Sequence, residues 1–81
     1  MAGFARTEAE IAERVSRYLK AELKRADVTY EGLAERLAKQ GLKGETAHSI
    51  AAKLKRGTFP ATFLLGALAA LELDGVRLQD V

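Results

Sequence analysis

The sequence predicts an all-α fold of four or five helices in a single domain, residues 1–81. Its 81 residues include 15 Ala and 12 Leu, which favour helices, but only four Val and two Ile, which favour strands. Apolar residues recur at the 3.6-residue spacing of helices, and Gly, Pro and Thr separate the periodic segments. These signals predict helices over residues 7–26, 30–40, 45–56 and 60–73.

The first helix, over residues 7–26, is predicted to be amphipathic. No Gly or Pro interrupts it, and its apolar residues from Ile11 to Leu23 share one arc at about 100° per residue. The opposite arc carries basic residues mixed with Glu, which is typical of a solvated face. Thr7 and Glu10 have the spacing of a capping box, which predicts that the helix begins just after Thr7.

Two short helices are expected next, over residues 30–40 and 45–56. Thr29 predicts the N-cap of the former, and Gly41 and Gly57 predict where the two helices end. Small residues on the facing sides, Ala34, Ala38, Ala47 and Ala51, predict a close and steep crossing, which is the geometry of a helix-turn-helix. The later helix is expected to bury Ala47, Ile50, Ala51 and Leu54, and to direct outward His48, Ser49, Ala52, Lys53, Lys55 and Arg56.

The fourth helix, over residues 60–73, is expected to begin at Pro60, whose backbone is preset for a first helical turn. It is apolar nearly all round, so one side is expected to meet a partner. After a turn, residues 76–79 alternate apolar and polar side chains, which predicts a short C-terminal strand. A lone strand needs a partner, and the simplest is the same strand of a second copy. The sequence therefore predicts a homodimer with an interface of Leu65, Leu68, Val76 and Leu78.

The composition disfavours several classes of function. The absence of Cys excludes a disulfide framework and a thiolate zinc site. One His and two Ser form no catalytic motif, so we expect no enzyme, no cofactor, no metal and no small-molecule substrate. Residues 1–10 lack the apolar core of a signal peptide, and the longest apolar run, residues 63–73, is too short to span a bilayer. We expect a cytoplasmic protein, not bound to a membrane, and associated with the nucleoid if it binds DNA.

Positive charge is concentrated in the middle of the chain. Residues 36–56 have a net charge of +5, whereas residues 1–35 and 57–81 have net charges of −1 and −2. A basic surface of this kind suits a polyanion such as DNA; the alternative is an ordinary solvated surface. The candidate DNA-binding residues are Tyr30, Lys43, His48, Ser49, Lys53, Lys55 and Arg56. Of these, His48 and Ser49 are expected nearest the base edges, and the three Lys and Arg56 are expected at phosphates. Tyr30 either binds a phosphate at its helix N-terminus or packs its ring on the helix of residues 45–56.

Several segments of the chain resemble known families. Residues 19–73 resemble the lambda-repressor-like (Cro/C1, or xenobiotic-response-element) helix-turn-helix class, with a Thr-capped helix, a Leu-Ala core pair, and a recognition helix that ends in a basic residue and Gly. More closely, residues 19–25, 28–37 and 53–59 resemble a bacterial family of small domains of unknown function. The resemblance implies a four- to five-helix domain that binds duplex DNA.

The chain departs from the helix-turn-helix class in three ways. Tyr30 stands where the class usually has a Gln that helps to hold a phosphate, and the stretch over residues 41–57 is about four residues longer than in typical members. No Asn is present and both Gln lie outside the third helix, so the side chains that favour adenine are missing. The sequence therefore predicts a DNA-binding, homodimeric transcriptional regulator. The alternative is a homodimerising or partner-binding module of the same fold that does not bind DNA.

Overall fold

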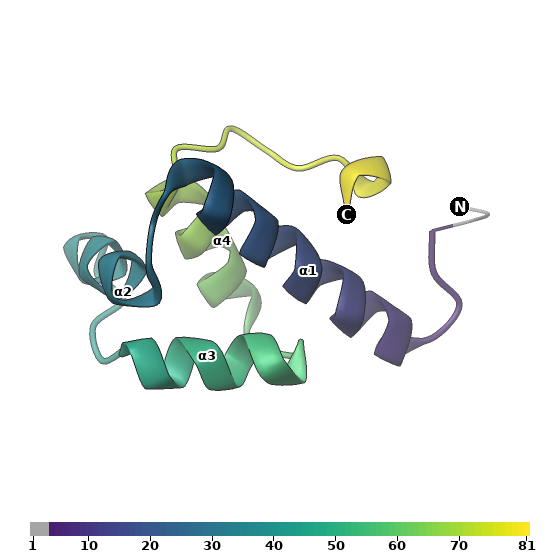
Figure 1. The fold of residues 1–81 in the computed structure, drawn as a ribbon, viewed down its shortest axis with the longest axis horizontal. Coiled ribbons are helices and arrows are strands. Elements are labelled where there is room, and N and C mark those ends of the chain that lie inside the picture. The colour runs from purple at the N-terminus through teal and green to yellow at the C-terminus, as the bar shows by residue number, and fades with distance from the viewer. Residues whose placement is uncertain (1–3) are drawn as a thin grey trace.

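The longest helix, α1 (Glu8–Ala26), crosses the whole molecule, and the shorter helices pack against it, mainly through α3, and against each other (Figure 1). A computed structural model of the chain describes residues 4–81; residues 1–3 of the predicted domain lie outside the described part. After α1 come three helices of ten residues each and a short 3-10 turn, in the order α2 (Tyr30–Lys39), α3 (Ala47–Arg56), α4 (Ala61–Ala70) and η1 (Leu78–Asp80). The prediction of an all-α fold is confirmed.

Three threonines fix where the first three helices begin. The hydroxyl oxygens of Thr7, Thr29 and Thr46 each accept a hydrogen bond from the backbone N–H three residues later, at 3.0–3.1 Å. In α3 the bond is reciprocal, because the hydroxyl of Ser49 accepts from the backbone N–H of Thr46 at 2.9 Å. An N-cap of this kind stabilises a helix by about 1 kcal/mol. The local sequence therefore places these three helix starts within a residue or two of the predicted positions.

Helices α1, α2 and α4 end in the same way, with a residue in the left-handed conformation. Gly41 has φ 94° after α2, as expected, whereas Asp27 after α1 and Glu72 after α4 have φ 58° and 60°. In each case the next N–H bonds back to a carbonyl five residues earlier at 2.9 Å, as in a Schellman motif. Because Glu72 turns the chain, α4 ends at Ala70 and not at the predicted residue 73.

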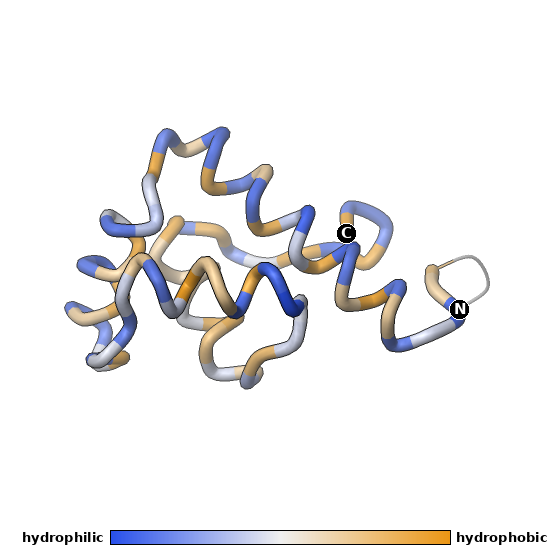
Figure 2. The backbone as a smooth tube through the Cα atoms, turned by 60° about the horizontal axis from the view of Figure 1, so that its bottom comes forward, coloured by the Kyte–Doolittle hydropathy of each residue, from blue (hydrophilic) through white to orange (hydrophobic). Residues whose placement is uncertain are grey.

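The core takes side chains from all four helices. In α1, hydrophobic and hydrophilic positions alternate with helical period, so one face is buried (Figure 2). In α4, nearly every position is apolar. Contacts between α2 and α3, α1 and α3, and α2 and α4 close the bundle. Within residues 4–81 no helix combines the length and the apolar character needed to cross a membrane. The largest fully buried side chains are Leu19, Leu33, Leu37, Ile50, Leu54 and Phe63.

The buried face of α3 is rotated from the predicted one. Ile50 and Leu54 are buried as expected, but Ala51 is exposed, and so is Ala38 of α2. Lys53 leans toward the core in place of Ala51, since its side chain finds an anionic partner there. The close crossing of α2 and α3 predicted from four alanines therefore relies on only two of them, Ala34 and Ala47, which are half-buried.

The predicted C-terminal strand is wrong. Residues 76–77 are not paired with any strand, and Leu78–Asp80 form a 3-10 turn held by local backbone bonds. The segment lies on the side of α1 opposite α3 (Figure 1), where Arg14 Nε donates to the carbonyl of Val81 at 3.0 Å. A four-residue alternation is too short a signal to outweigh these contacts with the segment's own chain. Strand pairing is therefore no basis for a dimer.

One residue of the predicted dimer interface lies in the core. Leu68 of α4 is only 6% exposed and belongs to the central hydrophobic cluster, so it cannot face a partner. The apolar pattern of α4 did not identify which side is covered, because apolar residues occur on every side. Leu65, Val76 and Leu78 are exposed.

We predict that Gly57→Ala destabilises the domain far more than Gly41→Ala. Both glycines have positive φ, 74° and 94°, but a Cβ on Gly57 would lie 2.7 Å from the carbonyl carbon of Ala12, whereas a Cβ on Gly41 would meet nothing within 4 Å. Gly41→Ala is expected to cost the left-handed strain alone, about 1–2 kcal/mol. Gly57→Ala causes the same strain and must also displace α1, so its expected cost in folding free energy is about 3 kcal/mol or more. Urea denaturation followed by circular dichroism measures both, and equal losses would contradict the close contact of α1 with Gly57.

Candidate nucleic-acid interface

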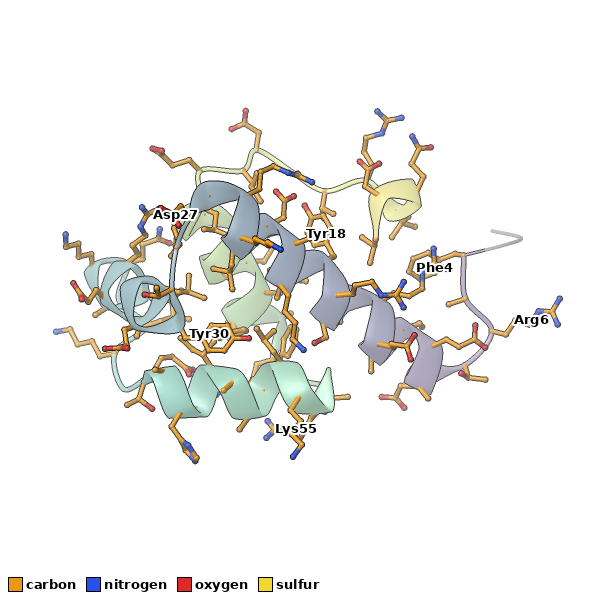
Figure 3. All side chains as sticks on the ribbon, viewed as in Figure 1. Phe4, Arg6, Tyr18, Asp27, Tyr30 and Lys55 are labelled. Carbon is orange, nitrogen blue, oxygen red and sulfur yellow. The ribbon has the colours of Figure 1, made fainter. Side chains whose placement is uncertain are left out.

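The outward face of α3 is the first part of the candidate interface. His48, Ala51 and Lys55 are all exposed and follow one another at the i, i+3, i+7 spacing of a single helix face. Figure 3 shows Lys55 pointing away from the other helices. No acidic residue occurs in α3. The face is therefore neutral or basic along its whole length, and its middle is lined by small side chains.

Two further predicted residues lie near the two ends of α3. Lys43, in the connection between α2 and α3, is exposed. Arg56 is exposed at the end of α3, where its guanidinium lies 3.5 Å from the carbonyl of Thr58. Among residues 4–81, no hydrogen bond or ion pair is formed by the side chains of Lys43, His48 or Lys55. These three side chains can therefore reach a ligand without breaking an internal contact.

Lys53 does not belong to this face, and its predicted outward orientation is wrong. Its Nζ lies 3.1 Å from Oε2 of Glu45, and only 19% of its side chain is exposed. The ammonium also lies 5.5 Å from the ring centroid of Phe63. The carboxylate of Glu45, at the foot of α3, draws Lys53 inward and neutralises it.

The hydroxyl of Ser49 is engaged within the protein. It accepts from the backbone N–H of Thr46 and lies 2.7 Å from Oε1 of Glu45, to which it donates. Ser49 is half-buried. Its structural role is to cap α3 and to help position Glu45, so the hydroxyl is not free to contact a base as expected.

Tyr30, the first residue of α2, packs its ring against the core and is half-buried. Figure 3 places the ring between the start of α2 and α3, which is the packing alternative considered for this residue. Tyr30 also lines a shallow groove of about 290 Å³ together with Thr29 and with Lys20 and Lys24 of α1. The start of α2 is therefore bordered by cations from another helix.

A second groove, between α1 and the end of α3, brings together four cations. It has a volume of about 530 Å³ and includes Arg17 and Lys20 from α1 and Lys55 and Arg56 from α3. Glu13 is the one acidic residue that lines it, and its carboxylate lies 2.7 Å from the guanidinium of Arg17. The groove thus retains an excess of positive charge.

Sequence reasoning missed the contribution of α1 to this groove. Its basic residues were interpreted as a solvated face because they are mixed with Glu along the chain. The spacing of Arg17, Lys20 and Lys24, at i, i+3 and i+7, would have placed them on one face, away from Glu8 and Glu22. That spacing is the signal that identifies them.

Small side chains hold α1 against α3. The hydroxyl of Ser16 in α1 donates to the carbonyl of Leu54 in α3, and both residues are buried. One turn of α1 earlier, the backbone of Ala12 lies directly against Gly57. These contacts set the spacing between the cations of the two helices.

The other side of α1 carries acidic as well as basic side chains. There Tyr18 faces the C-terminal segment, and burial raises the pKa of its hydroxyl, assisted by the negative charges of Glu22 and Asp80 and opposed by Arg25. Arg25 itself pairs with Glu22. Within residues 4–81 no group of three His, Cys, Asp or Glu side chains is placed to hold a metal ion.

We predict that Glu45→Gln destabilises the domain by about 1–2 kcal/mol, because it leaves the largely buried ammonium of Lys53 without its counter-charge. The matched control is Glu13→Gln, which breaks the ion pair with Arg17, whose two side chains are about 70% exposed. That change is expected to cost less than about 0.5 kcal/mol. Urea denaturation of both variants measures the difference, and equal stabilities would show that Glu45 does not stabilise α3 through Lys53.

Comparison with known proteins relates this helical arrangement to one family. The family is described as a domain of unknown function (DUF6471), and the match covers residues 11–76, from the second turn of α1 to the segment that follows α4. No curated protein and no solved structure shows a significant match. The matched range contains the four cations of the α1–α3 groove and the outward face of α3. The chain belongs to the DUF6471 family.

Proposed function

We propose that this domain binds duplex DNA through the outward face of α3, as a transcriptional regulator of the helix-turn-helix type. The observation that carries the proposal is the distribution of charge around α3. The helix contains no acid, and Glu45, the one acid in residues 36–56, is bonded to Lys53 and Ser49. A phosphate that approaches Lys43, His48 or Lys55 therefore meets no free carboxylate from this segment.

The dimensions of α3 support the proposal. Ten residues give a helix about 15 Å long, and a DNA major groove about 12 Å wide admits one α-helix. His48 and Lys55 are separated by about 10 Å along the axis. Between them lies Ala51, whose small side chain lets the helix backbone come close to the base edges.

The connection between α2 and α3 departs from a typical helix-turn-helix. Seven residues, 40–46, separate the two helices, whereas the turn of the common motif has three or four. This longer connection presents Lys43 beside α3 as an additional cation for phosphate. With Ser49 engaged in capping, His48 is the predicted residue that remains for base edges, so we expect phosphate contacts to supply most of the affinity.

We predict that Lys43→Gln combined with Lys55→Gln weakens DNA binding by about 10-fold at low salt. Wild-type affinity is expected to fall at least about 100-fold between 50 and 200 mM salt if the complex contacts about four phosphates or more, because each contact releases a counterion. Fluorescence anisotropy with a labelled random-sequence duplex measures both effects.

The matched control is Lys39→Gln combined with Arg77→Gln. It removes the same charge from exposed positions, one at the end of α2 and one in the C-terminal segment, and is expected to bind as wild type. The proposal is wrong if wild-type protein selects no duplex from a randomised pool at low salt.

We propose further that the domain forms a homodimer through the exposed side of α4. Leu65, in the middle of this apolar helix, is 64% exposed. With the strand absent, Val76 and Leu78 lose the pairing that made them interface candidates. A dimer would place two α3 helices in successive major grooves. A dimer without DNA affinity would instead favour the alternative function, a homodimerising or partner-binding module.

We predict that Leu65→Ser shifts the protein from dimer to monomer, because it removes the apolar side chain that a second copy would cover. Leu78→Ser is the control, since Leu78 is also exposed, at 48%, but lies in the C-terminal segment. Light scattering at high micromolar concentration gives the mass of each variant. A wild-type protein that is monomeric at that concentration would contradict the dimer.

A further inference from the structure

One face of α1 carries a row of cations that the proposed α3 interface does not include. Arg17, Lys20 and Lys24 follow one another at i, i+3 and i+7, so they lie on a common side of the helix. Lys20 and Lys24 are exposed and form no ion pair with any of residues 4–81. The row is about 10 Å long, and a single DNA strand places one phosphate every 3.4 Å along its axis.

Lys20, in the middle of this row, lies next to the end of α3 and next to the start of α2. It lines the α1–α3 groove with Lys55 and Arg56, and it also lines the groove at the start of α2 with Thr29 and Tyr30. The two grooves therefore meet at Lys20, one at the end of α3 and the other at the beginning of α2. Across the two grooves the only acid is Glu13, which is paired with Arg17.

We infer that α1 is a second DNA-binding element, which holds the sugar-phosphate backbone through Lys20 and Lys24 while α3 occupies the groove beside it. The inference rests on the proposed function, which supplies the ligand. The spacing of the two elements is fixed within the fold, because Ser16 bonds to the carbonyl of Leu54 and Ala12 packs on Gly57. The two rows of cations therefore meet the ligand as one preformed surface.

The chemistry of the row determines what it recognises. Lysine ammonium groups are point charges that suit phosphate oxygens, and contacts to phosphate carry no sequence information. The row is therefore expected to add affinity equally for all duplexes. Because α3 also lacks Asn and Gln, the whole interface recognises duplex DNA mainly by its backbone.

The test compares Lys20→Gln combined with Lys24→Gln against the Lys39→Gln, Arg77→Gln control. The loss of two phosphate contacts should reduce the slope of log K against log salt by about 1.8 for each bound copy, since each contact contributes about 0.9. The reduction should be the same for two duplexes of unrelated sequence, and the control should keep the wild-type slope. Thermal unfolding of each variant by circular dichroism verifies that the fold is intact.

The outcomes separate this inference from the proposed function. In one outcome, wild-type protein binds duplex DNA, the Lys43, Lys55 variant binds it more weakly, and the Lys20, Lys24 variant keeps the wild-type salt slope. The role of α1 is then overturned, and the role of α3 stands. If wild-type protein binds no duplex, both fail. The Lys20, Lys24 variant could instead lose binding to inorganic phosphate or to anionic lipid vesicles while its salt slope on DNA stays unchanged. That result would assign the row to a different anion and overturn the inference.

A second readout locates the contact directly. Titration of the ¹⁵N-labelled protein with a short duplex should shift the backbone amide resonances of residues 17–24 together with those of α3. The resonances of residues 76–80 should stay in place, because that segment lies on the opposite side of α1 (Figure 1). Shifts confined to α3 would overturn the inference.

Discussion

The contact between α1 and α3 is the constraint on which the rest of the molecule depends. Gly57 ends α3 in the left-handed conformation and at the same position leaves room for the backbone of Ala12. Ser16 then ties the next turn of α1 to the carbonyl of Leu54, and its hydroxyl satisfies a group that would otherwise be buried without a partner. Because small residues make this contact, the two helices lie close enough to form a shared basic groove, and the cations at the end of α3 come to lie beside those of α1.

Much of the fold was predictable because its signals are local. Thr7 and Thr29 act within three residues, so their capping roles can be seen in the sequence without knowledge of the packing. Gly41 and Gly57 mark helix ends in the same way. The end of α4 was missed because Glu72 adopts a left-handed conformation that its side chain does not favour. The C-terminal segment was missed because its position follows from Arg14, which is far from it in sequence.

The candidate site was less predictable, because charge summed along the chain is not charge on a surface. The +5 of residues 36–56 includes Lys53, which Glu45 neutralises, and Arg36, which donates to the carbonyl of Ala70 at 3.0 Å and so supports the end of α4. The same sum leaves out Lys20, which lies in α1, where acidic residues nearly balance the basic ones along the chain. Only the three-dimensional arrangement shows which cations have internal partners and which helices present them together.

The connection over residues 40–46 has a further consequence. Gly41 and Gly44 both have positive φ and neither has another group within 4 Å of its missing Cβ, whereas Leu42 packs against the core and Glu45 and Thr46 bond to α3. Doubling the length of a flexible loop costs only about 0.6 kcal/mol. Since α3 is oriented by its contact with α1 and is capped by Thr46, the turn around Gly44 can vary in length while the helix that follows stays in place. The domain thus separates the orientation of its exposed helix from the turn around Gly44, and that turn is free to acquire contacts of its own.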